Sequence, residues 1–361
     1  MFSRPLPTIA DNGPTAHDVH PFIDDSCRDS FLVFIDGQFR RELSNLSGLS
    51  AGIIASSLLS LSGSCEWQQK QRFVDMIESV PDSHQLPRNS FGSDVLTAIN
   101  LAQLDDAACI YVPKDTVQEA PLQILFCNTE DAQDSFSSSP RLLAFVDDGS
   151  SLRLKQSFAT ISNGALNNAT SGASLVISNT ALRLGTNARL DHTYVQDLSI
   201  RSRHLEVISA SVGGNASYDV TVLQTGASIA RVNIHVNLTE VGANCSLSGV
   251  SLAGDKQSLD MHSNILHDAR ACTSRQQQRN VIADRGEAIF KGRIQIPKHA
   301  QLTDSDQLCR SIMLGKRARI IAMPTLEITA DNIVCSHGAS VTDLDENSMF
   351  YLAARGIDRQ V

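Results

Sequence analysis

The sequence predicts a mainly β protein, in which a β-solenoid core follows a smaller α+β domain. A short corner signature recurs along the last two thirds of the chain, and apolar and polar residues alternate between its copies as they do in strands. Aromatic residues make up only 5% of the 361 residues, whereas hydrophobic residues make up 42%. The core must therefore consist of small and aliphatic side chains, which suits stacked β layers.

The first 107 residues are expected to form the N-terminal α/β helical domain. FLVFIDGQF (31–39) reads as a hairpin, because the turn pair Asp36-Gly37 lies between two apolar runs. EWQQKQRFVDMIESV (66–80) has the spacing of an amphipathic helix, and a further helix is expected over 93–103.

Residues 108–343 are expected to form the β core. It begins with two strands within 108–127 that are joined around 114–121. In the corner signature, Ala follows a small, polar or basic residue and precedes a hydrophobic residue two positions later. Gly and Asn supply turn conformations, and Ala allows coils to stack closely. The signature starts at residues 172, 187, 215, 226, 242, 299, 317 and 338.

The spacing of these corners is irregular, so the pattern alone leaves an antiparallel sandwich open beside the solenoid. A solenoid exposes an unfinished sheet at each end, and such an end must be capped or paired with another chain. The prediction of a solenoid therefore includes the prediction of an interface.

Composition excludes several classes of partner. The net charge of -9 and the pI near 5.5 argue against nucleic-acid binding, which needs a basic surface. The longest uncharged run, 43–65, holds too much Ser and Gly for a membrane helix, and the N-terminus shows no export signal, so a cytoplasmic protein is expected. The eight cysteines form no C-x-x-C pair, which indicates buried thiols in a reducing compartment.

The motifs for an enzyme are weak. GLSAG (48–52) matches G-x-S-x-G, but no buried strand precedes it, and Gly315-Lys316 lacks the rest of a nucleotide-binding loop. Asp219 and Glu240 resemble the scattered acids of a β-helix that cleaves polysaccharides, although no pairing can be read from the sequence. A polysaccharide-active enzyme and a purely structural solenoid remain alternatives.

Two groups of residues suggest metal chemistry. His262 and His267 lie near Asp260, but they fall on opposite faces of a strand, so no metal site is predicted there. Cys335 and His337 are two positions apart, so a strand places the thiol and the imidazole on the same face. Both are ligands for iron or an iron-sulfur cluster, yet a cluster normally takes four ligands. A second subunit would have to complete such a site.

Two stretches resemble a known family. They are GRIQIPKHAQLTDSDQLCRSIMLG (292–315) and PTLEITADNIVCSHGASVTDLDENSMFYLAARGI (324–357), with CSHGA at 335–339 as the most specific run. They resemble the SufB/SufD family, non-enzymatic scaffold subunits of the SUF machinery for iron-sulfur cluster assembly, and CSHGA favours the SufD branch over SufB.

The resemblance implies a right-handed parallel β-helix that forms a heterodimer with a SufB-like paralogue. It implies a SufC-like ATPase as a further partner, so that this chain itself binds no nucleotide. It also implies a transient iron or iron-sulfur cluster shared with the paralogue, with His337 as the metal ligand and Cys335 as the second candidate. The family continues with a C-terminal helical region that contacts the ATPase, so 344–361 is expected to be the start of a truncated region. Homodimerisation of the isolated chain stays open.

Overall fold

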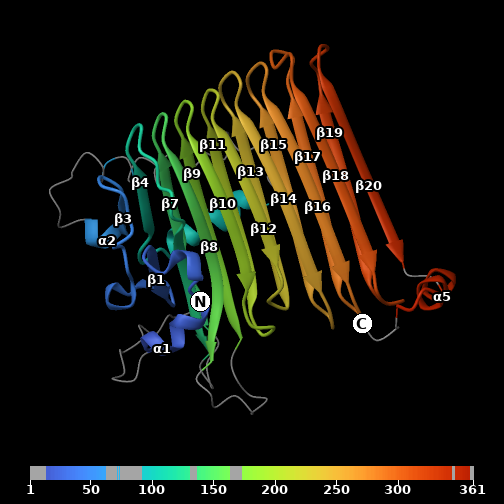
Figure 1. Ribbon diagram of the computed structural model, residues 1–361, viewed down its shortest axis with the longest axis horizontal. Helices are drawn as coiled ribbons and strands as arrows, with labels where there is room; N and C mark the ends of the chain where they lie inside the picture. Colours follow the sequence, from blue (N-terminus) through green and yellow to red (C-terminus); the bar gives the residue numbers. More distant parts are fainter. Residues whose placement is uncertain are drawn as a thin grey trace.

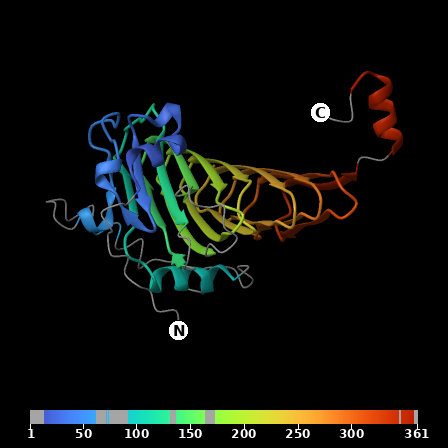
Figure 2. The same ribbon diagram turned by 90° about the horizontal axis from the view of Figure 1, so that it is seen from below.

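Two large β-sheets lie face to face along the length of the molecule and form a parallel β-solenoid of about 7 turns (Figures 1 and 2). The computed structural model describes residues 14–61, 71, 73, 92–130, 136–162, 173–343 and 346–357. From residue 174 onward the chain crosses from one sheet to the other after every strand, and each strand pairs in parallel with the next strand of its own sheet. The parallel pairing confirms the solenoid and excludes the antiparallel sandwich.

We call the two sheets A and B. In order across sheet A the strands are β2 (Gln38–Phe39), β1 (Phe31–Ile35), β5 (Leu122–Glu130), β8 (Ser151–Ser162), β10 (Arg189–Asp197), β12 (Ser217–Gln224), β14 (Asn244–Ala253), β16 (Thr273–Ile282), β18 (Asp304–Met313) and β20 (Val334–Asp343). In order across sheet B they are β19 (Arg319–Ile328), β17 (Glu287–Ile296), β15 (Ser258–His267), β13 (Ile229–Leu238), β11 (Arg203–Val212), β9 (Ser174–Leu184), β7 (Arg141–Val146), β4 (Ala108–Val112) and β3 (Ile54–Ser57), while β6 (Phe136–Ser138) pairs with β9.

The corners of the solenoid carry most copies of the predicted signature. Asn187 and Asn215 have positive φ angles of 58° and 52°, and the alanines that follow them are buried. A buried alanine at such a corner leaves room for the next coil to stack. The prediction is wrong for Ala339, which lies within β20 and is exposed, because Gly338 there continues a strand and makes no turn.

The N-terminal residues extend both sheets. Asp36 and Gly37 form the predicted hairpin turn between β1 and β2, both with positive φ. β1 pairs in parallel with β5 of sheet A, and β3 pairs antiparallel with β4 of sheet B. Strands on both sides of residue 107 therefore share the same sheets. The helices and 3-10 turns are α1 (Ala16–Val19), η1 (His20–Phe22), η2 (Asp25–Cys27), η3 (Arg41–Leu43), α2 (Leu58–Leu61), α4 (Ser93–Ala102) and α5 (Glu346–Ala354).

The predicted helix over 93–103 is confirmed as α4, which lies on the outer face of sheet B. The amide of Asn100 donates to the carbonyl oxygens of Pro140 (2.9 Å) and Ile177 (2.8 Å). Ser93 contacts His235 on β13 at 2.7 Å. The helix expected over 66–80 lies outside the described residues, apart from 71 and 73, which are helical. Among the described helices, none is long and apolar enough to span a membrane.

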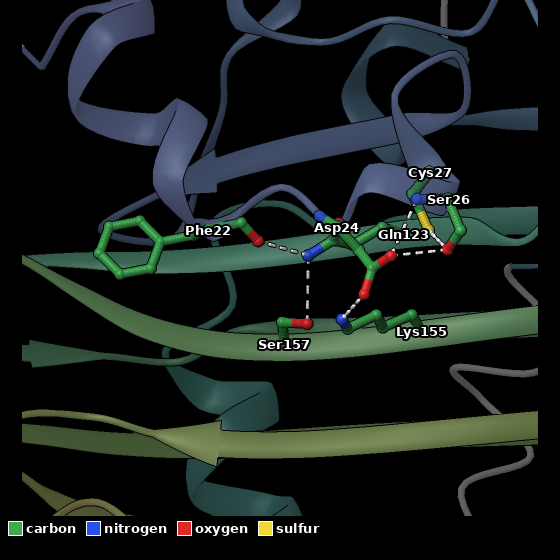
Figure 3. A network of polar contacts seen from close by, with 7 residues as sticks. All are labelled: Phe22, Asp24, Ser26, Cys27, Gln123, Lys155 and Ser157. Carbon is green, nitrogen blue, oxygen red and sulfur yellow. Dashed lines mark hydrogen bonds and ion pairs between the residues drawn. The ribbon is translucent and has the colours of Figure 1, made fainter.

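A polar network fixes the segment around η2 to the outer face of sheet A (Figure 3). The side-chain amide of Gln123 donates to the carbonyl of Phe22 (2.8 Å), and its oxygen accepts from the backbone N–H of Asp24 (2.9 Å). Asp24 also forms an ion pair with Lys155 on β8, and this contact holds the pKa of Asp24 well below its usual range. The network joins residues about one hundred positions apart in the chain, so it depends on the completed fold.

The interior of the solenoid contains a buried carboxyl group. Glu206 on β11 is fully buried and accepts a hydrogen bond from Ser178, and burial raises its pKa to about 8. His204, whose Nε2 lies 3.9 Å from the Glu206 carboxylate, is held neutral because burial lowers its pKa to about 3. Both groups are therefore uncharged in the folded protein near neutral pH.

Replacing Glu206 by Gln should stabilise the protein at neutral and mildly alkaline pH. An unfolded Glu titrates near about pH 4.3, so between that pH and about 8 the folded state holds a proton that the unfolded state releases. The free energy of unfolding of the wild type then falls as pH rises through this window. The advantage of Glu206→Gln should grow by up to about 1.4 kcal/mol per pH unit, measured by urea unfolding across the window. A difference between the two proteins that does not change with pH would contradict this assignment.

The chain after β20 forms the helix α5. Gly356, with φ 84°, ends it: the N–H of Gly356 donates to the carbonyl of Ala353 and that of Ile357 to the carbonyl of Leu352, which is the Schellman arrangement. Asp343 and Glu346 also have the spacing of a capping box, which predicts that a capped helix begins after Asp343. Asp343 is the last residue of β20, and residues 344 and 345 lie outside the described residues, so this cap stays a prediction.

Candidate functional site

The predicted pair Cys335 and His337 lies on β20, the last strand of sheet A. β20 pairs with β18 on one side and is the end of the strand order on the other. Most of its residues are exposed, because no further coil stacks beyond it among the described residues. β20, which carries the pair near its first residues, therefore lies at the open end of the solenoid (Figure 1).

Cys335 and His337 share the face of β20 that continues the solenoid interior. Their register partners on β18 are Ser305 and Gln307, which are both buried. Cys335 is half-buried and packs against an aliphatic cluster that includes Ile294. His337 is exposed. The prediction that a strand would place both side chains on one face is consistent with this register.

The environment of Cys335 keeps its thiol protonated until a ligand binds. Partial burial raises the pKa of the thiol, a hydrogen bond with Ser305 lowers it, and the nearby carboxylates of Asp306 and Asp304 raise it further. A metal ion bound to the sulfur would have to displace this proton. His337 is exposed, so its imidazole is accessible to a ligand.

Two polar ladders run from this pair into the solenoid. Behind Cys335, the hydroxyl of Ser305 contacts that of Ser274 at 2.7 Å, and Ser274 contacts Nε2 of His267 on sheet B at 2.9 Å. Behind His337, the amide of Gln307 donates to Gln276 (2.7 Å), which donates to Ser263 (2.6 Å). All of these interior residues are buried.

The sequence contained a signal for these ladders that the motif search missed. In TSRQQQRNVI, which forms β16, the interior positions are held by Ser274, Gln276, Gln278 and Asn280. A buried strand normally alternates apolar residues inside with polar residues outside. Polar side chains at alternate positions of such a strand predict a hydrogen-bonded interior. This prediction requires knowing which of the two faces of the strand points inward.

Gly292 on β17 leaves the space that Gln307 occupies. A Cβ atom at this position would lie 2.2 Å from Nε2 of Gln307 and 2.6 Å from the ring of Phe290. Both side chains are buried, so Gly292→Ala should destabilise the protein by about 1–3 kcal/mol, measured by urea unfolding. The matched control is Gly254→Ala, because a Cβ there meets nothing within 4 Å and should leave stability nearly unchanged. Equal stability of the two variants would rule out this packing.

The pair does not complete a metal site within the described part of the chain. No group of three or more His, Cys, Asp or Glu side chains there is arranged to hold a metal ion. Ser336, between the two candidate ligands, points to the opposite face and donates a hydrogen bond to Asp306. A thiol and an imidazole suit iron, but the remaining ligands of a cluster would have to come from elsewhere.

Among the described strands, none pairs with the outer edge of β20, and the backbone N–H and C=O groups of Cys335 and His337 lie on this edge. The N–H of Val334 donates to Thr303 next to β18, and bonding alternates along a parallel strand. The N–H and C=O groups of the alternate residues Cys335, His337, Ala339 and Val341 therefore point to the free edge. A partner strand that added here would lie beside the two candidate ligands.

The other sequence motifs hold no catalytic arrangement. Ser50 lies in a loop and its hydroxyl donates to the carbonyl of Val117 at 3.1 Å, so GLSAG is no nucleophile elbow. Glu240 accepts from the N–H of Gly214 at 2.9 Å at a corner, whereas Asp219 on β12 contacts Arg189 at 3.9 Å. These two acids serve separate local contacts.

The three candidate residues around 260 also separate in space. Asp260 pairs with Arg231 on the outer face of sheet B at 2.6 Å, while His267 contacts Ser274 inside the solenoid. His262 shares the outer face with Asp260, two positions along the strand. Opposite faces for His262 and His267 are therefore confirmed, and these residues form no common metal site.

Comparison with known proteins places the chain in a family. Residues 127–361 match the family described as SUF system FeS cluster assembly, SufBD core domain. The chain is 28% identical over 329 residues to an iron-sulfur cluster assembly SufBD family protein of Synechocystis, covering 91% of this chain and 70% of the relative. It is 30% identical to the chloroplastic protein ABCI7 of Arabidopsis thaliana over 75% of this chain and 56% of the relative. It is also 29% identical to the iron-sulfur cluster assembly protein SufD of Escherichia coli, over 50% of this chain and 42% of the relative.

The matched region begins within β5 and includes β20 with both candidate ligands. This chain belongs to the SufBD core-domain family of the SUF system for iron-sulfur cluster assembly.

Proposed function

We propose that this chain is a SufD-like scaffold subunit that binds a SufB-like paralogue along the free edge of β20 and has no catalytic activity of its own. The observation that carries the proposal is an incomplete ligand set, Cys335 and His337, on an unpaired strand edge. Strand addition would bring a second chain's ligands next to these two. The transient iron or iron-sulfur cluster would then be shared between the two chains as cargo.

His337 is the proposed primary ligand and Cys335 the second. The imidazole is exposed, whereas the thiol is half-buried, has a raised pKa and must be deprotonated before it binds a metal. Gln307 on β18 is the register partner of His337. Its buried side-chain amide oxygen has no hydrogen-bond partner among the described residues, so it can help to orient the His337 ring.

The energy for assembly would come from a SufC-like ATPase, because this chain offers no nucleotide-binding loop in its sequence. We propose that the contact involves the helical region that begins with α5, where Phe350 and Tyr351 are largely exposed.

We retain residues 1–107, 108–343 and 344–361 as proposed domains, although strands from both sides of residue 107 share the two sheets.

The proposed compartment is a reducing one. The described cysteines are all free, and most of them are buried. Free thiols in this number are typical of the cytoplasm or of a comparably reducing organelle. The name of the Arabidopsis relative adds the chloroplast to the compartments to consider.

Co-expression tests the proposal directly. The full chain would be produced together with a SufB-like and a SufC-like protein from the same organism, and the purified material analysed for a stable complex and for cluster assembly from iron and sulfide. The expected result is a complex that contains both chains and forms a cluster. Absence of any complex, or a cluster formed equally well without this chain, would remove the scaffold role.

A further inference from the structure

The outer face of sheet A carries two arginines that face each other on neighbouring strands. Several arginines of the solenoid are paired with acids on the neighbouring coil, as in Arg275–Asp304 (2.5 Å) and Arg319–Glu287 (3.4 Å). Arg279 on β16 and Arg310 on β18 are instead direct register partners. Both are exposed, and among the described residues neither forms an ion pair. Like charges directly opposite each other destabilise a strand pair, so this arrangement needs another explanation.

An aliphatic row lies beside these arginines. Leu252 on β14 is opposite Val281 on β16, which is opposite Ile312 on β18. Each of the last two lies two positions beyond an arginine on its own strand, so they share the outer face. Leu252 is 42% exposed and Ile312 is 41% exposed. We call these five residues, Leu252, Arg279, Val281, Arg310 and Ile312, the arginine–aliphatic face.

No described segment covers the arginine–aliphatic face. The N-terminal segment around η2 lies over β8 and β10, at the other end of sheet A. In Figure 1, β14, β16 and β18 run side by side away from that segment. The pocket beside Asp24 and Lys155 is lined by residues of β8 and β10 and does not include the arginine–aliphatic face.

We propose that the arginine–aliphatic face binds an acidic amphipathic helix of a partner protein. The two rows run across the strands, about 6.6 Å apart, and neighbouring positions within a row are about 4.8 Å apart. One turn of an α-helix rises 5.4 Å, so a helix lying across the strands can place one apolar side chain per turn on the aliphatic row. Acidic side chains on the adjacent stripe then meet Arg279 and Arg310.

Charge and chemistry favour this occupant over other anions. This face holds two arginines, whereas a long polyanion such as nucleic acid needs an extended basic surface. A purely ionic ligand would leave the exposed aliphatic row unused, whereas an acidic amphipathic helix uses both rows. The inference is independent of the proposed function, because it rests on the outer face of sheet A and not on the edge of β20.

A defined peptide provides the first test. A stapled helical peptide with a leucine stripe and an adjacent glutamate stripe would be titrated against the full chain by fluorescence anisotropy, beside a control peptide with Lys in place of each Glu. We expect the glutamate peptide to bind at least tenfold more tightly than the control, and to weaken as salt rises. The variant Arg279→Glu/Arg310→Glu should lose at least tenfold in affinity for it.

The matched control variant is Arg183→Glu/Arg203→Glu, which makes the same charge change on exposed positions of sheet B. It should bind the glutamate peptide like the wild type. No binding of the peptide, equal binding of both peptides, or an equal loss in both double variants would overturn the proposal.

A photo-crosslinking residue in place of Ile312, in the full chain in cells, identifies the natural occupant. The crosslinked fragment of the partner should be acidic and amphipathic, and the adduct should disappear when Arg279→Glu/Arg310→Glu is added. A crosslink to nucleic acid, or to a second copy of this chain, would overturn the assignment of the occupant.

Discussion

Replacing His337 by alanine should reduce cluster formation at least about tenfold, in line with the losses seen when the surroundings of a metal site are altered. The imidazole is the proposed primary ligand, and it is exposed on β20. Cluster assembly would be followed by visible absorbance in the purified complex, and growth would be followed in iron-starved cells that lack other assembly routes.

Ser336→Ala is the matched control, because Ser336 lies between the two ligands on the opposite face of β20. It should assemble clusters at the wild-type rate while retaining the partner. His337→Ala should also keep its partner, since the backbone edge is unchanged. Equal cluster yields for His337→Ala and the wild type would exclude His337 from the site, even if the complex itself forms.

Replacing Ala339 by proline should weaken association with the SufB-like paralogue at least tenfold, which corresponds to about 1.4 kcal/mol of binding free energy. The N–H of Ala339 points to the free edge, and proline removes that donor and places its ring where a partner strand would pair. Proline is tolerated on an edge strand when the lost N–H faces outward. The stability of the isolated chain should therefore change little.

Ser340→Pro is the informative comparison for this variant. The N–H of Ser340 belongs to the set that bonds to β18, so proline at this position should destabilise the fold itself. Affinity for the paralogue would be measured by surface plasmon resonance, and stability by urea unfolding. Comparing the two variants then distinguishes a weakened interface from a destabilised fold. Wild-type affinity of Ala339→Pro for the paralogue would show that the chains associate elsewhere.

The two experiments test different parts of the same proposal. Suppose that Ala339→Pro binds the paralogue weakly but any remaining complex still assembles clusters at the normal rate. β20 would then be the interface between the two chains, without evidence that it carries the metal ligand. Loss of chemistry in His337→Ala with normal binding would identify the ligand only. Both results together are expected if the cargo site is shared across the β20 edge.

Sequence patterns were sufficient for features that depend on neighbours in the chain. The hairpin at Asp36-Gly37 and the helix α4 follow from local turn chemistry and periodicity. The same holds for the shared face of Cys335 and His337, since side chains two apart on a strand always project to one side. The local pattern failed at Ala339, where the pairing of β20 with β18 extends a strand through a turn-like signature.

By itself, then, the sequence favoured a β-solenoid without excluding a sandwich, and it supplied the family motif at 335–339 and the two candidate ligands. Only the tertiary structure decided that β20 is an edge, that Ser305 and Gln307 stand behind those ligands, and that Arg279 meets Arg310. The reason is register. Each of these contacts joins residues about 30 positions apart, and the length of every intervening corner fixes which side chains come into line.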